Sequence, residues 1–274
     1  MTSGLRRMAK VVAGSASEFL RTGAPPRQQR LRALYLDLME GCLTGTIYED
    51  APLRALGQEH YDAELREYGW DWPSVAPTMI GSKRLSNLRS LTESVIQRRI
   101  PGDLMETGVW RGGACIMMRA ILQAYDLRSR RVWLVDSFEG VPAPDPEHYP
   151  ADAGATFHEF PDLVVGLDEV KSNFERFGLL DDQVVFLKGW FRDTLPSADV
   201  DRLALLRLDG DLYESTIIPL EALYDKVSRG GFVIVDDFHV VDGCRTAVED
   251  FFESRSISPS VEEIDGVGIY WRKE

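Results

Sequence analysis

Apolar positions follow two alternating patterns from residue 82 onward. One is a helical spacing of Leu85, Leu88, Leu91 and Val95, for which Ser82 is the expected N-cap. The other is a series of short strand-like runs, Asp103–Glu106, Val132–Asp136, Val184–Lys188, Leu203–Asp209 and Phe232–Asp236, with helical segments between them. Short apolar strands that alternate with helices predict a parallel sheet covered by helices on both faces.

Two further strand-like runs end the chain. Val261–Ile264 and Val267–Trp271 are separated only by Asp265-Gly266, a pair typical of tight hairpin turns. They predict an antiparallel hairpin that completes the sheet. The whole pattern therefore predicts an α/β fold with a seven-stranded, mostly parallel, Rossmann-like sheet and helices on both faces.

The first 81 residues do not follow this alternation, and they predict a tail and a helical extension ahead of a domain at residues 82–274. Residues 5–14 are too short in apolar length for a signal peptide, so a tail or a short helix is expected. Residues 22–30 predict a linker and residues 31–39 a helix. The extension, with the aromatic segment 70–73, is expected to cover the functional site or to form a dimer contact.

Composition and charge narrow the range of partners. The 274 residues are 44% hydrophobic, which is enough for a full core. A formal net charge of −13 argues against nucleic acid and anionic membranes, which are bound through Lys and Arg. No apolar run approaches the roughly 18–20 residues that span a bilayer. The three cysteines, Cys42, Cys115 and Cys244, form no zinc or disulfide pattern, so a reducing cytoplasm is expected.

A glycine-rich turn, Glu106-Thr-Gly108-Val-Trp-Arg-Gly112-Gly113, follows the first strand-like run. Its glycines let the backbone approach a ligand and the next helix. Trp110 stands where a dinucleotide motif needs its second glycine, which favours the cationic cofactor S-adenosylmethionine. Glu106 is then expected to face the ammonium group of that cofactor, and Thr78 and Met79 to touch its methionine end.

The next two strand ends supply further cofactor candidates. Asp136 and Ser137 follow the second strand, where a carboxylate can accept hydrogen bonds from both ribose hydroxyls; a turn cap is the alternative. Gly189 and Trp190 follow the third strand and are expected to receive the adenine edge. Core packing is the alternative role for Trp190.

Carboxylates at the ends of the fourth and fifth strands predict a metal site. Asp209, Asp236 and Asp237 would repel one another without a cation, and their all-oxygen character selects Mg²⁺, Mn²⁺ or Ca²⁺ over Zn²⁺. Two structural alternatives exist. Asp211 and Glu214 resemble a capping box for a helix at 213–227, and Asp237 can simply end a strand.

These motifs resemble those of the macrocin O-methyltransferase family, along residues of about 31–272. The resemblance is carried by Glu106–Cys115, Val135–Pro142, Phe186–Pro196, Leu208–Ser215 and Val233–Asp237. It implies a class I methyltransferase fold and metal-dependent methylation of sugar hydroxyls on macrolides, aminocoumarins and related glycosylated antibiotics. It also implies that the three aspartates hold Mg²⁺, that Glu106 and Asp136 belong to the cofactor site, and that the enzyme is a homodimer.

Methylation of a hydroxyl also requires a general base, and the substrate needs a segment that encloses it. Catechol-type relatives carry a lysine shortly after the first metal aspartate, but this chain has Asp211 there, which makes Asp211 the first candidate for the general base and His239 the second. The long connection at 141–161 is expected to act as a lid. A catechol or phenol O-methyltransferase would keep the same cofactor and metal motifs, and it remains the alternative function.

Overall fold

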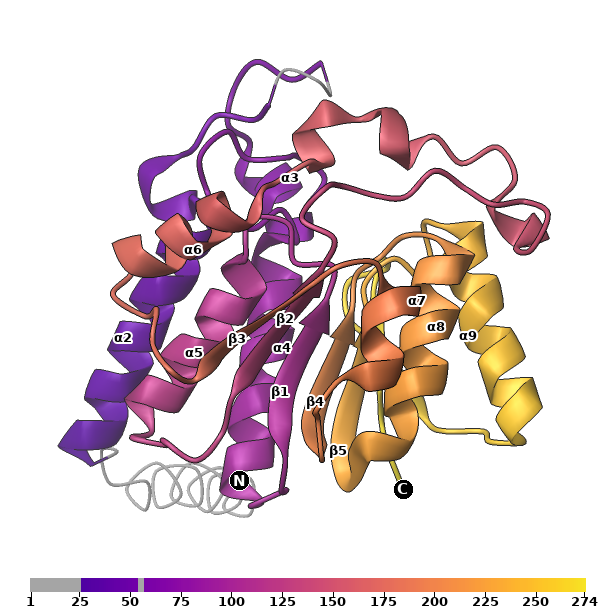
Figure 1. The fold of residues 1–274 in the computed structure, drawn as a ribbon. Coiled ribbons are helices and arrows are strands. Elements are labelled where there is room, and N and C mark those ends of the chain that lie inside the picture. The colour runs from indigo at the N-terminus through magenta and orange to yellow at the C-terminus, as the bar shows by residue number, and fades with distance from the viewer. Residues whose placement is uncertain (1–25, 54–56) are drawn as a thin grey trace, which may run out of the picture.

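The computed structural model describes residues 26–53 and 57–274, and within them seven strands form one sheet in the order β3-β2-β1-β4-β5-β7-β6 (Figure 1). The strands are β1 Asp103–Thr107, β2 Val132–Asp136, β3 Val184–Lys188, β4 Leu203–Leu208, β5 Val227–Val235, β6 Val261–Glu263 and β7 Ile269–Arg272. Strands β1 to β5 are parallel, and β7 runs antiparallel to both β5 and β6. The predicted α/β fold is confirmed.

Helices cover both faces of the sheet (Figure 1). One face carries α2 Arg27–Thr44, α4 Gly81–Gln97, α5 Gly113–Ala124 and α6 Leu167–Arg176, and the other carries α7 Phe191–Thr194, α8 Tyr213–Leu223 and α9 Asp242–Arg255. Successive strand residues point to opposite faces, so Leu205 enters the first core cluster and Leu206 the second. The apolar strands are therefore buried on both sides, as their composition predicts.

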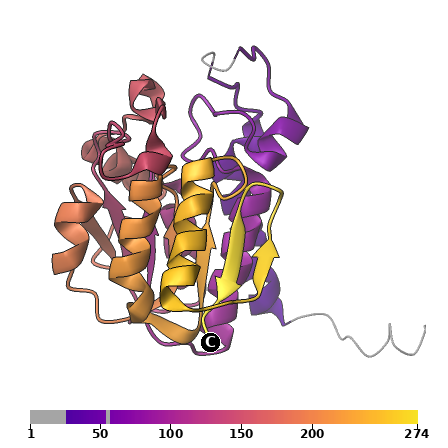
Figure 2. The same cartoon turned by 90° about the vertical axis from the view of Figure 1, so that its right-hand side faces the viewer.

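Two irregular segments lie over the carboxyl ends of the parallel strands (Figures 1 and 2). The first precedes α4 and contains the short helices η1 Thr46–Tyr48 and α3 Ala63–Tyr68. The second, the covering loop (residues 141–166), contains η3 Pro150–Asp152, η4 Phe157–Glu159 and η5 Pro161–Leu163. Two more short helices, η6 Leu195–Ser197 and η7 Tyr224–Lys226, precede β4 and β5. The segment before α4 and the covering loop therefore cover the edge of the sheet where ligands bind in such folds.

Four local predictions differ from the structure. The connection between β6 and β7 is residues 264–268, so Asp265-Gly266 alone does not form the hairpin turn. Helix α4 begins at Gly81 with Ile80 at its N-cap, so Ser82 is not the cap. Helix α2 begins inside the expected linker, at Arg27. Strand β5 begins at Val227, a residue assigned from sequence to the preceding helix. The tail or short helix expected at residues 5–14 lies outside the described residues.

The early start of β5 has a physical cause in Gly230 and Gly231. Gly230 has a φ of +85°, and a Cβ on Gly231 would lie 2.7 Å from the carbonyl oxygen of Ala204. The β4–β5 register shifts between Leu203 and Leu205. The two glycines therefore form an irregularity inside the strand, which begins five residues before the predicted Phe232. No helix in the described part of the chain has both the length and the apolarity needed to cross a membrane.

Candidate active site

A cavity of about 360 Å³ opens at the carboxyl ends of β1, β2, β4 and β5. It lies where the strand order reverses, between β1 and β4, which is the usual ligand position in open α/β sheets. The predicted site residues on its wall are Thr78, Met79, Glu106, Gly108, Asp136, Ser137, Trp190, Asp209, Asp211, Asp236 and Asp237. Gly112, Gly189 and His239 do not line it. One cavity thus brings together most of the residues predicted from separate motifs.

The glycine turn after β1 is fixed by close backbone approaches. Gly108 has a φ of +79°, and a Cβ there would lie 1.7 Å from the carbonyl oxygen of Asp209. Gly112 has a φ of +85° and is the N-cap of α5, where a Cβ would lie 2.8 Å from a methyl group of Val170. Gly108 therefore seats the turn against the β4 loop, and Gly112 lets α5 pack against α6.

Gly113, the last residue of the glycine turn, connects the turn to the segment before α4. The backbone N–H of Gly113 donates to the carbonyl oxygen of Pro77 at 2.9 Å. A Cβ on Gly113 would lie 2.6 Å from that oxygen, so the approach requires glycine. The contact brings Thr78 and Met79 onto the cavity wall beside β1.

Glu106 is the most deeply buried of the carboxylates predicted for the cofactor, with 1% of its surface exposed. Its Oε1 accepts from Arg207, and its Oε2 accepts from the Cys115 thiol at 2.9 Å. Burial raises the pKa of Glu106 to about 7, against the lowering effect of the Arg207 guanidinium. A cationic ligand group in this cavity would favour the ionised carboxylate.

Asp136 anchors two turns at once. Its Oδ2 accepts from the backbone N–H of Val109 at 2.7 Å, and its Oδ1 accepts from that of Phe138 at 2.7 Å. Burial raises the pKa of Asp136, and these backbone donors oppose the rise. The Ser137 hydroxyl donates to the carbonyl oxygen of Gly140 at 2.9 Å and shapes the same turn.

The residues after β3 separate into two positions. The N–H of Gly189 donates to the carbonyl oxygen of Asp136 at 2.9 Å, and its φ of +141° with a Cβ contact to Thr194 at 2.7 Å requires glycine. Gly189 does not line the cavity, whereas Trp190 lines it and is partly exposed. Trp190 is therefore available to a ligand.

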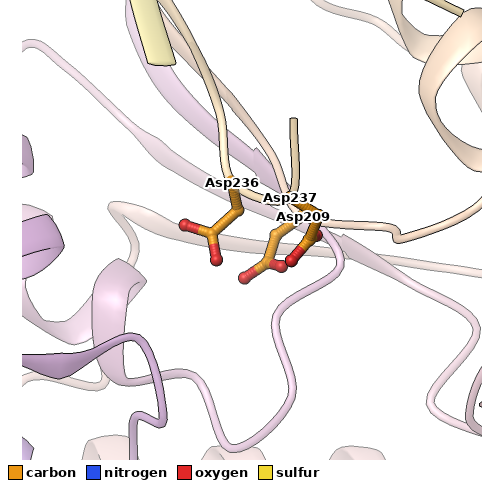
Figure 3. A group of neighbouring side chains, drawn as sticks. All are labelled: Asp209, Asp236 and Asp237. Carbon is orange, nitrogen blue, oxygen red and sulfur yellow. The ribbon is translucent and has the colours of Figure 1, made fainter. Parts of the chain in front are cut away.

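Asp209, Asp236 and Asp237 lie side by side after β4 and β5 (Figure 3). Each offers a carboxylate oxygen, and these oxygens all lie within 4.8 Å of one another. The Oδ2 of Asp237 is buried and has no hydrogen-bond partner. Burial first, and then the charges of Asp211, Asp209 and Asp236, raise the pKa of Asp237 well above its ordinary value.

Two buried arginines share this acidic group. Arg207 on β4 donates to Glu106, to Asp209 at 2.6 Å and to Asp236, which links carboxylates of three neighbouring strands. Arg84 on α4 also donates to Asp236, and its Nε lies 3.1 Å from an oxygen of Asp265. Asp237 accepts none of these hydrogen bonds from Arg84 or Arg207. The unpartnered oxygen and the all-oxygen donor set fit a hard divalent cation.

Asp211 does not form the capping box with Glu214. The N-cap of α8 is Leu212, which has no side-chain cap, and the N–H groups of Tyr213 and Glu214 are accepted by Asp152 of the covering loop. Burial, followed by the charges of Asp209 and Asp236, raises the pKa of Asp211 to about 7. The carboxylate of Asp211 is thus left on the cavity wall beside the three aspartates.

The structure does not bring His239 into this group. Its Nε2 lies 2.7 Å from a carboxylate oxygen of Glu263, and its ring packs edge-on against Phe238. Its neighbours Val240 and Val241 line the cavity, but His239 does not.

Sequence reasoning missed both arginines and the strained turns. Arg207 had a visible signal, because it is a charged residue inside the otherwise apolar run Leu203–Leu208. Trp110, Phe138 and Asp211 have left-handed backbones, with φ of 46°, 56° and 61°, and each follows a different strand at the cavity. Non-glycine residues held in this conformation concentrate at functional sites.

Known proteins match nearly the whole described chain. The family model of macrocin-O-methyltransferase (TylF) matches residues 32–273. The 8-demethyl-8-(2,3-dimethoxy-alpha-L-rhamnosyl)-tetracenomycin-C 4'-O-methyltransferase of Streptomyces olivaceus is 53% identical, over 88% of this chain and 93% of that protein. The mycinamicin III 3''-O-methyltransferase of Micromonospora griseorubida is 48% identical, over 88% and 96%.

A solved structure agrees with the sequence matches. The structure of the O-methyltransferase NovP is 50% identical, with a TM-score of 0.85, and covers 88% of this chain and 99% of that chain. The chain is therefore an O-methyltransferase and belongs to the macrocin O-methyltransferase family.

Proposed function

We propose that this chain is an S-adenosylmethionine- and Mg²⁺-dependent O-methyltransferase that methylates a hydroxyl of a deoxysugar on a glycosylated natural product, such as a macrolide or aminocoumarin antibiotic. Its family membership supports methyl transfer to oxygen. The names of two relatives specify a rhamnosyl tetracenomycin and mycinamicin III as their acceptors. The observation that carries the proposal is the convergence of Asp209, Asp236 and Asp237 beside Asp211 in the cavity that also contains Glu106 and Asp136.

The cofactor half of the cavity supplies two anionic contacts. In this proposal Glu106 accepts hydrogen bonds from the ammonium group of S-adenosylmethionine, and Asp136 accepts them from its ribose hydroxyls; the place of both residues on the cavity wall supports these roles. Thr78 and Met79, held by the Pro77–Gly113 contact, form the adjoining wall. These residues bind and orient the methyl donor, which is the proximity contribution to catalysis.

The acidic half binds and deprotonates the acceptor. Asp209, Asp236 and Asp237 would hold the divalent cation, which supplies orientation and a lowered pKa to a sugar hydroxyl. Asp211 is the base that accepts the hydroxyl proton, because it lines the cavity and is free of the helix-capping role. His239 lacks that position. The covering loop and the Trp70–Trp72 segment form the outer wall around the acceptor.

The test is an acceptor panel run with and without chelator. Purified protein, S-adenosylmethionine and Mg²⁺ are incubated with deoxysugar glycosides of several aglycones and, separately, with catechols and other phenols. We expect methylated glycosides by mass spectrometry, loss of turnover in EDTA and recovery with added Mg²⁺. Methylation of the phenols alone would replace the sugar assignment, and full turnover in EDTA would overturn the metal assignment.

Cofactor binding provides a separate control in the same preparation. Because Glu106 and Asp136 lie on β1 and β2, whereas the three aspartates follow β4 and β5, S-adenosylmethionine should still bind in EDTA when binding is measured by calorimetry. Lost turnover with retained binding assigns the effect to the metal half. Lost binding would show instead that the cofactor half of the cavity depends on the metal.

A further inference from the structure

Helix α8 begins without a cap of its own. It starts two residues after Asp211, and its N-cap Leu212 has no side-chain hydrogen bond to the helix. The first N–H groups of a helix have no partner inside the helix and need an acceptor from elsewhere. Whatever supplies that acceptor also fixes the short loop that carries Asp209 and Asp211.

The acceptor is Asp152, on the covering loop. Its Oδ1 accepts from the N–H of Tyr213 at 2.6 Å, and its Oδ2 accepts from the N–H of Glu214 at 3.0 Å. Only 2% of Asp152 is exposed, although it lies about 60 positions away in sequence. Both oxygens of this buried carboxylate are therefore used to cap a distant helix.

A second helix end closes around the same carboxylate. Gly243, in the first turn of α9, packs so tightly that a Cβ there would lie 2.7 Å from Oδ1 of Asp152 and 3.1 Å from the N–H nitrogen of Tyr213. The amino ends of α8 and α9 both carry partial positive charge, which stabilises an anion between them. Asp152 is thus buried between the amino ends of two helices, and a side chain at position 243 would displace it.

The covering loop is tied at a second point, on the cofactor side. The indole N–H of Trp110, in the glycine turn, donates to the carbonyl oxygen of Asp162 at 2.8 Å. Three residues of the loop line the cavity: Val141 and Pro142, which precede Asp152, and Phe157, which lies between Asp152 and Asp162 in sequence. The loop therefore spans the site, with Asp162 fastened beside β1 and Asp152 fastened to the helix that follows the Asp209–Asp211 loop.

We propose that Asp152 is a positioning residue that couples the covering loop to the catalytic loop, so that the wall around the acceptor and the placement of Asp211 are set together. The proposal rests on the proposed function, in which Asp211 is the base. Asp152 touches no reacting atom. It acts through the first turn of α8, and its removal should free both the loop and the residues before that turn.

The experiment compares four variants of the full chain. Asp152→Ala removes both capping bonds, and Asp152→Asn keeps one acceptor oxygen. Gly243→Ala leaves Asp152 unchanged but fills its niche, and it improves rather than harms the intrinsic helix propensity of α9. The matched control is Asp103→Ala. That carboxylate also accepts two N–H bonds, from Arg131 and Trp133 at 2.9 Å each, but it lies at the opposite end of β1.

We expect Asp152→Ala to lower kcat by about 10-fold and to raise the KM of the acceptor, since small displacements of a positioned group cost this much or more. The Kd of S-adenosylmethionine should change less than about threefold, because Glu106 and Asp136 are untouched. Gly243→Ala should show the same pattern. Asp152→Asn should recover most of kcat, and Asp103→Ala should lower the Tm without changing kcat.

Hydrogen exchange gives a readout that requires no turnover. Peptides from residues 141–166 and 209–216 should exchange faster in Asp152→Ala and in Gly243→Ala than in the wild-type protein. Their exchange rates should be unchanged in Asp103→Ala. If Asp152→Ala matches the control in both kcat and exchange, the coupling is wrong. If the wild-type protein methylates no acceptor, the proposed function fails, while the exchange measurement still decides whether Asp152 links the two segments.

Discussion

The backbone of Asp211 lies in the left-handed region, with a φ of 61°, at the cavity end of β4. Asparagine tolerates this conformation well, so Asp211→Asn should leave the local backbone intact. Because Asp152 caps α8, the substitution also removes no capping bond. Burial first, and then the charges of Asp209 and Asp236, raise the pKa of Asp211, and the substitution removes the titrating carboxyl group from this cluster.

We expect Asp211→Asn to keep its Tm and its affinity for Mg²⁺ and S-adenosylmethionine, and to lose kcat by roughly 10²-fold or more, the usual size of a general-base contribution. The Tm, calorimetric affinities and kcat are measured on one preparation. A normal kcat would remove Asp211 as the base, whatever the Tm.

Cofactor binding should release a proton from Glu106. Its pKa of about 7 arises first from burial, and a cation beside it favours the charged form. Binding of the S-adenosylmethionine ammonium should therefore lower that pKa and release about half a proton per site at pH 7. Calorimetry in buffers of different ionisation enthalpy measures the release, and Glu106→Gln should abolish this component. Equal proton release by both proteins would contradict the assignment.

At the scale of elements, the glycine turn and the β4 loop can pack only with glycine at position 108. Gly108→Ala would impose a positive φ on alanine and place its Cβ 1.7 Å from the carbonyl oxygen of Asp209. We expect a loss of more than about 3 kcal/mol in the free energy of unfolding.

Gly178→Ala separates the two causes of that loss. Gly178 has a φ of +65° but nothing within 4 Å of its Cβ position, so it should cost only about 1 kcal/mol. Chemical denaturation of both variants measures the difference. Equal losses would show that backbone conformation alone, and not the contact with the β4 loop, requires glycine at 108.

The strands and the motifs at their ends were predictable because the signal for each lies in a few residues that are adjacent in sequence. Alternating apolar runs defined all seven strands, and carboxylates directly after β4 and β5 indicated the acidic cluster. The start of β5 was not predictable, because the bulge at Gly230 depends on its partner strand. Asp152 and Arg84 were missed for a related reason. Asp152 lies 61 positions from Tyr213 and Arg84 lies 152 positions from Asp236, and only the packed topology brings these pairs together.

At the scale of the whole molecule, the cavity has two halves on either side of the β1–β4 boundary. Asp136→Ala, on the cofactor half, should weaken S-adenosylmethionine binding by roughly 1.5–3 kcal/mol, the range for hydrogen bonds to charged groups. Its affinity for Mg²⁺ should stay the same, since the metal candidates follow β4 and β5. Calorimetry with each ligand checks both statements. A parallel loss of Mg²⁺ affinity would contradict this independence.

The sheet ends at β6, which is a poor place for another chain to attach. This strand has only three residues, all exposed, and two of them are Glu262 and Glu263. Short, charged edge strands disfavour pairing between sheets and so limit aggregation. Two copies meeting at this edge would also bring like charges together. The homodimer expected from the family resemblance should therefore not be held by a sheet continued through β6.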